Sequence, residues 1–188
     1  ASQRVDLRYD HKTYPVEIPL IGEFQALNAV MAAGFALSLG EKAEVVFEAL
    51  AALKTVKGRM EHIGATAEGA HVFVDYAHTP DGLDVLLRAA RPHAPGRIIL
   101  VFGCGGDRDK TKRPSMGAIA VKHADIVILT DDNPRTESAD TIRQDVRVGC
   151  PNALEIGDRG DAITKGISLL EKGDCLLIAG KGHETGQL

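Results

Sequence analysis

Two arginines stand in polar segments that directly follow apolar runs. They are Arg108 in "VFGCGGDRDK" and Arg135 in "ILTDDNPRTE". A guanidinium group is a planar fork that binds a carboxylate through two parallel hydrogen bonds. Two such forks, together with the single negative charge of Glu184 in "AGKGHE", would suit a small ligand with carboxylates and an ammonium group. These residue types therefore predict a site that binds an amino acid.

Both arginines also have a plainer interpretation. Asp132 or Asn133 followed by Pro134 is typical of a type I turn with proline at its second position, which accounts for every residue there except Arg135. Arg108, which lies between two aspartates, is also explained as a partner in a surface ion pair, and such pairs contribute little stability. The sequence leaves these alternatives open.

Several nucleotide and metal motifs are not matched. The glycines of "GCGGDRDK" could expose N–H groups to an anion, but the segment lacks the G-x-x-x-x-G-K-[ST] pattern, and its aspartates would repel phosphate. No GxGxxG follows an apolar run, so a dinucleotide oxidoreductase domain is not supported. His78 and His183 lack an HxH, HExxH or cysteine partner and indicate local hydrogen bonds rather than a metal site.

Composition narrows the class of protein further. The chain has 188 residues, a formal net charge of −4 and 44% hydrophobic residues, which suits one domain or one domain plus part of another. The mild acidity and 4% aromatic content argue against a nucleic-acid partner. No apolar run reaches the roughly 18 residues of a membrane span. Three widely spaced cysteines without a CxxC indicate reduced thiols in a cytoplasmic protein.

The elements that must position these residues alternate in type. The runs "HVFVDY", "RIILVFG", "ADIVILT", "ALEIG" and "DCLLIAG" predict strands, and helices are expected over about 80–91, 114–123, 138–147 and 159–171. This rhythm predicts an α/β fold with a mostly parallel sheet and flanking helices. Right-handed crossovers would bring every strand's C-terminal end to one edge, where the polar segments would meet.

The opening of the chain has a different pattern. Residues 5–20 alternate with period two and predict a strand pair. Apolar residues then recur at helical spacing from Phe24 to Leu39, and a second helix is expected over about 42–54. We expect this part to be the tail of a domain whose beginning is missing, and we place the boundary between residues 64 and 65.

Six segments, taken in chain order, resemble the Mur ligases, the ATP-dependent amide-forming enzymes of peptidoglycan synthesis. They are "GEFQALNAVMAAG", "KGRMEHI", "VDYAHTPDGL", "VFGCGGDRDKTKRPSMGAIA", "TDDNPRTE" and "AGKGHE". The resemblance is to the type that adds meso-diaminopimelate to UDP-N-acetylmuramoyl-L-alanyl-D-glutamate. It implies that residues 1–64 are the helical tail of a central ATPase domain, and that residues 65–188 are most of a Rossmann-like amino-acid-binding domain.

The resemblance also implies which residues bind the amino acid. Asn133 and Arg135 of the "DNPR" tetrad would contact meso-diaminopimelate, and Arg108 would join them at a carboxylate. Gly180 and Glu184 would hold the distal end of the ligand. Because L-lysine lacks the second carboxylate, Arg135 would be left without its partner and would discriminate against that amino acid.

ATP contacts, by the same resemblance, would fall on Asn28, Arg59, Asp75 and His78. Asp75 would accept hydrogen bonds from ribose hydroxyls, and Arg59 would stabilise charge on the transferring phosphate. In the family reaction ATP phosphorylates the substrate carboxylate, the amine of the amino acid attacks the acyl phosphate, and magnesium bridges the phosphates.

The chain also departs from the family pattern. The P-loop, the magnesium ligands, the carbamylated lysine and the UDP-binding domain of the family lie upstream, so we expect the catalytic residues outside this chain and no ligation by the chain alone. Gln25 replaces a frequent asparagine, and Gly186 stands where an aromatic residue is common. The alternatives are a Mur ligase for another amino acid such as L-lysine, or a non-catalytic Rossmann-like binding module.

Overall fold

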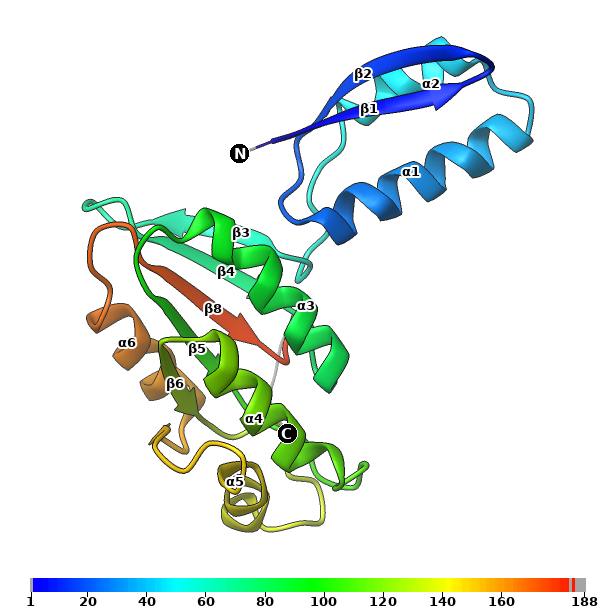
Figure 1. Cartoon of the computed structure of the whole chain (residues 1–188). Helices are drawn as coiled ribbons and strands as arrows, with labels where there is room; N and C mark the ends of the chain where they lie inside the picture. Colours follow the sequence, from blue (N-terminus) through cyan, green and yellow to red (C-terminus); the bar gives the residue numbers. More distant parts are fainter. Residues whose placement is uncertain (1, 183, 185–188) are drawn as a thin grey trace. The chain divides into compact units, whose positions relative to one another are not determined.

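The fold is described from a computed structural model, which covers residues 2–182 and 184. His183 and Gly186 lie outside these residues. The chain divides into two compact units, Ala1–Val56 and Lys57–Leu188, which are described separately (Figure 1). In the described residues no helix is long and apolar enough to cross a membrane.

The N-terminal unit pairs a β-hairpin with two helices. Strands β1 (Gln3–Tyr9) and β2 (Lys12–Ile18) are antiparallel, which confirms the predicted strand pair. Helices α1 (Glu23–Ser38) and α2 (Ala43–Leu50) follow within a few residues of their expected positions. The unit buries its own core, in which Ile18, Ala29 and Phe47 are members. Neither the hairpin nor either helix could bury its apolar side chains alone.

The C-terminal unit is built on a six-stranded sheet. Its strands are β3 (Glu61–Ala65), β4 (His71–Asp75), β5 (Ile98–Phe102), β6 (Ile126–Leu129), β7 (Leu154–Glu155) and β8 (Cys175–Ala179). Their order is β3-β4-β8-β5-β6-β7, and all neighbours are parallel except β3 and β4. This arrangement confirms the predicted, mostly parallel sheet.

Helices cover both faces of this sheet, as Figure 1 shows. They are α3 (Pro80–Ala90), with the short 3-10 helix η1 (Arg91–His93) after it, α4 (Lys112–His123), α5 (Ala139–Arg147) and α6 (Arg159–Ser168). The central strand β5 is buried along its whole length. Thr79 caps α3 by accepting a hydrogen bond from Gly82 N, and Pro80 occupies the first turn, as sequences of this kind favour.

Strand β3 is the element that the sequence does not reveal. It pairs antiparallel with β4, with a register irregularity between His62 and Gly64. Its side chains are half-buried or exposed and include a glycine, so it forms no apolar run. Because β3 belongs to the sheet, the units divide between Val56 and Lys57, eight residues before the predicted boundary at 64.

Candidate functional site

The C-terminal edge of the sheet carries a cleft of about 630 Å³. Its walls come from four strand exits: Tyr76 and His78 after β4, Gly105 and Arg108 after β5, Asn133 and Arg135 after β6, and Gly180 and Glu184 after β8. All five residues predicted to bind the amino acid therefore line one cleft. This is the edge at which parallel α/β sheets bind ligands.

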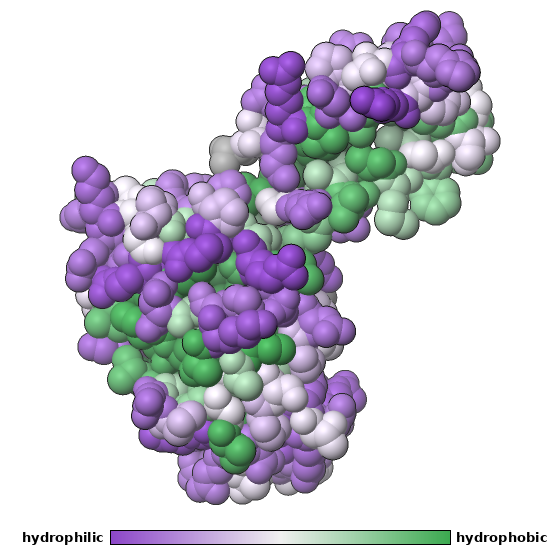
Figure 2. Space-filling model, viewed as in Figure 1, coloured by the Kyte–Doolittle hydropathy of each residue, from purple (hydrophilic) through white to green (hydrophobic). Residues whose placement is uncertain are grey.

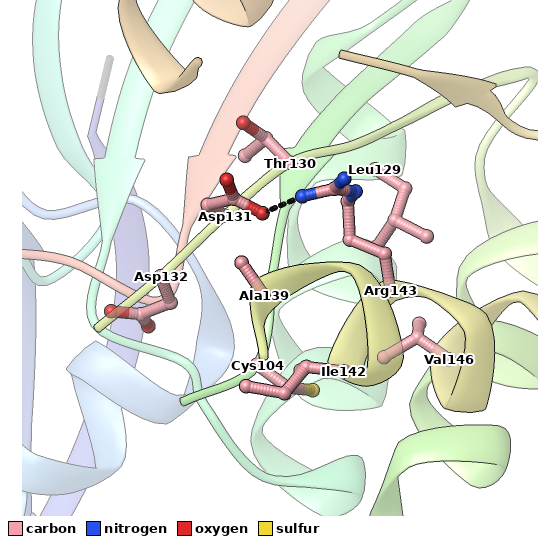
Figure 3. Close-up of a pocket in the computed structure, with 9 residues that line it drawn as sticks. All are labelled: Cys104, Leu129, Thr130, Asp131, Asp132, Ala139, Ile142, Arg143 and Val146. Carbon is pink, nitrogen blue, oxygen red and sulfur yellow. Dashed lines mark hydrogen bonds and ion pairs between the residues drawn. The ribbon is translucent and has the colours of Figure 1, made fainter. Parts of the chain in front are cut away.

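The segment after β6 is anchored by an ion pair at its start. Asp131 pairs with Arg143 of α5, whose guanidinium also pairs with Asp140 and Glu155. Figure 3 shows Asp131 turned towards Arg143 while Asp132 lies away from that pair. Asp132 lines the cleft instead. The anchored acid thus leaves the next residues of the segment facing the cleft.

A tight turn presents Arg135, but it is not the turn expected from the sequence. Glu137 N donates to Pro134 O at 3.0 Å, so proline is first in the hydrogen-bonded turn and Arg135 is second. Arg135 has a φ of 53°, in the left-handed region. Its Nη1 donates to Gly106 O at 2.6 Å, which ties the side chain to the loop after β5. One nitrogen is thus used in positioning, and the guanidinium has further donors for a ligand.

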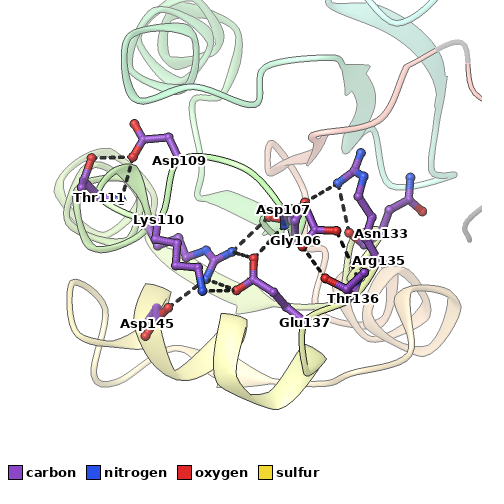
Figure 4. Close-up of polar contacts among 12 residues, drawn as sticks. Gly106, Asp107, Asp109, Lys110, Thr111, Asn133, Arg135, Thr136, Glu137 and Asp145 are labelled. Atoms are coloured by element: carbon purple, nitrogen blue, oxygen red, sulfur yellow. Dashed lines mark hydrogen bonds and ion pairs between the residues drawn. The ribbon is translucent and has the colours of Figure 1, made fainter.

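The loops after β5 and β6 are bonded to each other (Figure 4). Gly106 N donates to Asn133 O at 2.9 Å, and Thr136 Oγ1 donates to Asp107 Oδ1 at 2.6 Å. Asp109 accepts from Thr111 instead. Neither aspartate pairs with Arg108 in the part of the chain that the structure describes, so the surface ion pair offered as an alternative is wrong.

A buried arginine lies behind both loops. Arg113 of α4 is 0% exposed and donates Nη2 to Glu137 Oε1 and Nη1 to Asp145 Oδ2, each at 2.9 Å. It also donates to Gly105 O at 3.3 Å. Arg113 and then Lys110 lower the pKa of Glu137 to about 2. The sequence did not predict that Arg113 pairs with Glu137 and Asp145. The arginine of "KRP" and the glutamate of "DNPRTE" were its only signal.

The segment after β8 is fixed by backbone contacts. Gly180 has a φ of 90°, which favours glycine, and its N–H donates to Asp75 O at 3.1 Å. Gly182 N donates to Glu184 Oε2 at 2.8 Å, so the carboxylate of Glu184 is held near its own chain. The two predicted contacts at this exit therefore have defined positions in the cleft wall.

The residues predicted to contact ATP are divided between the two units. His78 lines the cleft, and its Nδ1 lies 3.0 Å from Tyr76 O, the kind of local hydrogen bond that the sequence indicated. Arg59 stacks over the ring of Tyr76, 4.8 Å from its centroid. Asn28 is exposed on α1 of the N-terminal unit. The roles assigned to these residues stay predictions.

Asp75 accepts hydrogen bonds from two backbone N–H groups of the C-terminal unit. Its Oδ2 accepts from Met60 N and its Oδ1 from Ala77 N, each at 2.7 Å, and the side chain is buried. Burial raises the pKa of this carboxyl, and the two N–H groups oppose the shift. Each oxygen retains one lone pair, so the ribose contact stays a prediction, while the contacts present here fix the loop that carries Arg59.

One further cation lines the cleft without having been predicted. Lys112, at the start of α4, donates Nζ to His78 O at 2.7 Å and so bridges the exits of β4 and β5. In the sequence Lys112 is one of four cations in "DRDKTKR". Their spacing alone does not show which of these side chains face the cleft. Over residues 2–182 and 184 there is no group of three or more His, Cys, Asp or Glu that could hold a metal ion.

The chain is similar to known proteins along almost its whole length. The family model described as "Mur ligase, glutamate ligase domain" matches residues 58–182. The UDP-N-acetylmuramoyl-L-alanyl-D-glutamate–2,6-diaminopimelate ligase of Agrobacterium fabrum is 52% identical over 186 residues, covering 99% of this chain and 38% of that protein. The enzyme of the same name from Zymomonas mobilis is 53% identical with the same coverage.

Solved structures give the same result. A structure of a UDP-N-acetylmuramoyl-L-alanyl-D-glutamate–2,6-diaminopimelate ligase has a TM-score of 0.68 at 38% identity, covering 98% of this chain and 38% of that one. The UDP-N-acetylmuramate-alanine ligase of Thermotoga maritima has a TM-score of 0.73 at 22% identity over 96% of this chain and 40% of its own, a likeness of fold alone. The chain thus spans about 38% of the length of the curated relatives named here, and it belongs to the Mur ligase family.

Proposed function

We propose that the protein carrying this chain is an ATP-dependent ligase that adds meso-diaminopimelate to UDP-N-acetylmuramoyl-L-alanyl-D-glutamate in peptidoglycan synthesis. The observation that carries the proposal is the meeting of Arg108, Arg135 and Glu184 in one cleft. Relatives about half identical over nearly the whole chain bear the corresponding name. A ligase that consumes ATP and a UDP-linked substrate would work in the cytoplasm.

The cleft suits the charges of this amino acid. Meso-diaminopimelate has two carboxylates and two amino groups. Arg108 and Arg135 would each take a carboxylate as a planar fork, and Asn133 would add an amide contact. Gly180 and Glu184 would hold the distal end, where a carboxylate favours an ammonium group. Fixing the ligand at both ends holds its reacting amine in one place, which is how such a site would accelerate amide formation.

The chain would also supply part of the ATP site. When bound, ATP would supply the phosphoryl group that activates the dipeptide carboxylate, and magnesium would neutralise charge on its phosphates. Arg59 is half-buried and stacked on Tyr76, so its charge is held beside the cleft, where it would stabilise a phosphate. His78, Asp75 and Asn28 are the other proposed contacts. We place the catalytic residues and the magnesium ligands outside this chain, as the family pattern implies.

Calorimetric titration with meso-diaminopimelate and then with L-lysine tests the proposal. Binding of the first and much weaker binding of the second are expected, because lysine leaves Arg135 without a carboxylate. Arg135→Ala should weaken binding of meso-diaminopimelate by about ten- to a hundred-fold, the value of a charge-assisted hydrogen bond. Arg88→Ala is the control, since Arg88 is exposed on α3 and pairs only with Asp84 among the described residues.

The same titrations on the full-length protein with a non-hydrolysable ATP analogue complete the test. Binding only there would show that the site needs the rest of the protein to close. Failure of meso-diaminopimelate to bind a folded full-length protein would overturn the proposal, and preference for L-lysine would assign the other amino acid. Equal losses of amino-acid and nucleotide binding in Arg135→Ala would contradict the role given to Arg135.

A further inference from the structure

Arg159, the first residue of α6, lies between two of the segments that form the cleft. It is 9% exposed. Its Nε donates to Asp131 O at 3.0 Å, and its Nη1 donates to Ala179 O at 3.2 Å. These carbonyls belong to the segments after β6 and at the end of β8, just before Asn133 and Gly180. One side chain therefore joins the backbones that supply two of the proposed ligand contacts.

The remaining nitrogen of this guanidinium has no assigned use. Arg159 Nη2 is buried and lacks a hydrogen-bond partner within the described residues. A Cβ atom added to Gly180 would lie 3.9 Å from Nη2 and 3.6 Å from Asp132 Oδ2. Nη2 thus lies just behind the cleft wall that Gly180 forms. An unbonded N–H in such a place is costly unless something else in the molecule uses it.

Arg159 also differs from three other arginines of this unit. Arg97, Arg113 and Arg143 each pair with a carboxylate. Arg159 instead donates to two carbonyl oxygens. Burial lowers the pKa of its guanidinium, and the carboxylate of Asp132 is the strongest influence opposing that shift. Asp131 and Glu184 oppose the shift as well, so three carboxylates offset this charge, and what distinguishes Arg159 is the pair of carbonyls that it joins.

We propose that Arg159 is a positioning residue for the amino-acid cleft. It fixes the spacing between the exits of β6 and β8, and with it the separation of Asn133 and Gly180. It acts through Asn133 and Gly180 and has no place in the cleft wall itself. The inference rests on the proposed function, because the ligand is taken to be an amino acid with two carboxylates.

Steady-state kinetics of the full-length ligase test this role. In Arg159→Gln the KM for meso-diaminopimelate should rise about ten- to a hundred-fold, the fold-change that corresponds to one or two hydrogen bonds from a charged group. The KM for ATP should stay near that of the wild type. Arg159→Lys keeps the charge but cannot bridge two carbonyls. Its KM for meso-diaminopimelate should therefore lie between the values of the wild type and of Arg159→Gln.

Arg97→Gln is the matched control. Arg97 pairs with Asp174 and donates to Leu169 O, near the opposite ends of β5 and β8. Its loss should lower the melting temperature and leave both KM values unchanged. If Arg159→Gln raises both KM values together, the positioning role is wrong and the residue only stabilises the fold.

Two further outcomes are decisive. Should Arg159→Gln fail to fold, a folded Arg159→Lys with a wild-type KM for meso-diaminopimelate would overturn the inference. A wild-type protein that does not ligate meso-diaminopimelate would instead overturn the proposed function, and this inference with it. The wild-type reaction thus tests the function, while the ratio of the two KM values in the variants tests Arg159.

Discussion

Arg135 and Asp107 both have a φ of 53°, a left-handed conformation that costs a non-glycine residue about 1–2 kcal/mol. They lie in the two loops that supply the predicted arginine forks. Thr136, next to Arg135, donates both its hydroxyl and its N–H to the carboxylate of Asp107. Each strained residue is therefore held through contacts with the other loop, which sets the direction of the arginine before a ligand arrives.

Glu137 is the carboxylate that makes this arrangement sensitive to pH. It accepts hydrogen bonds from Arg113 and from Asp107 N. Its pKa falls from 4.5 to about 2 on folding, so its contribution to stability is fully present above about pH 4.5 and is lost as the pH falls towards 2. Glu137→Gln should unfold at lower urea concentration than the wild type at pH 7, and this difference should shrink on acidification.

The measurement is a set of urea unfolding curves for both proteins at pH 7, 4 and 3. Asp140→Asn is the control, because Asp140 is an exposed carboxylate of the neighbouring helix α5 and pairs with Arg143 within that helix. A difference in unfolding midpoint between Glu137→Gln and wild type that is as large at pH 3 as at pH 7 would contradict the assignment.

At the scale of elements, α4 and the end of α5 pack closely enough to require glycine. A Cβ atom at Gly117 would lie 2.3 Å from Val146 O, and one at Gly149 would lie 2.0 Å from Pro114 O. Both distances are far inside van der Waals contact, so one of the helices would have to move. Because α5 carries Asp145, which pairs with Arg113, such a movement would reach the loops of the cleft.

Gly117→Ala should accordingly destabilise the C-terminal unit by about 1–3 kcal/mol, the usual cost of overpacking. Gly34→Ala is the matched control, since Gly34 lies within α1 and a Cβ there would meet nothing within 4 Å. That change should stabilise its helix by about 0.5–1 kcal/mol. Urea unfolding measures both, and a neutral Gly117→Ala would show that the helices can separate freely.

The elements also show what the sequence could predict. Five apolar runs correspond to β4, β5, β6, β7 and β8. The run is clearest for β5, β6 and β8, because strands buried on both faces need uninterrupted apolar residues. Strand β3 escaped prediction, since an antiparallel edge strand with exposed side chains carries no such run. Arg113 looked like one more loop cation, because its partners Glu137 and Asp145 lie 24 and 32 residues away. Pairings at that distance depend on how the elements fold together.

At the scale of the whole molecule, each unit has its own core, but the two differ in what they leave exposed. Helix α1 buries Ala26, Ala29 and Ala33. On its other side Leu27, Met31, Phe35 and Leu39 recur every four residues and are 58–85% exposed. In Figure 2 hydrophobic colour lies over α1 on the N-terminal unit. A unit of this size buries little apolar area, so we expect it to be the less stable of the two.

All residues that line the cleft belong to the C-terminal unit, which leads to a prediction for a truncated protein. Residues 57–188 alone should unfold cooperatively and should bind meso-diaminopimelate with the dissociation constant of the 188-residue chain. Binding of an ATP analogue should weaken on truncation, because the family pattern places a nucleotide contact on Asn28. The variant Asn28→Ala in the 188-residue chain should reproduce part of that loss.

The test is calorimetric titration of the truncated protein, the 188-residue chain and its Asn28→Ala variant. Each is titrated with meso-diaminopimelate and with the ATP analogue. A truncated protein that stays folded but loses meso-diaminopimelate would mean that the first 56 residues contribute to amino-acid binding. Loss of the amino acid and the nucleotide in parallel would mean that the two sites are coupled through the N-terminal unit. Retained amino-acid binding with weakened nucleotide binding would assign the two ligands to separate parts of the chain, because only the nucleotide then depends on residues before Lys57.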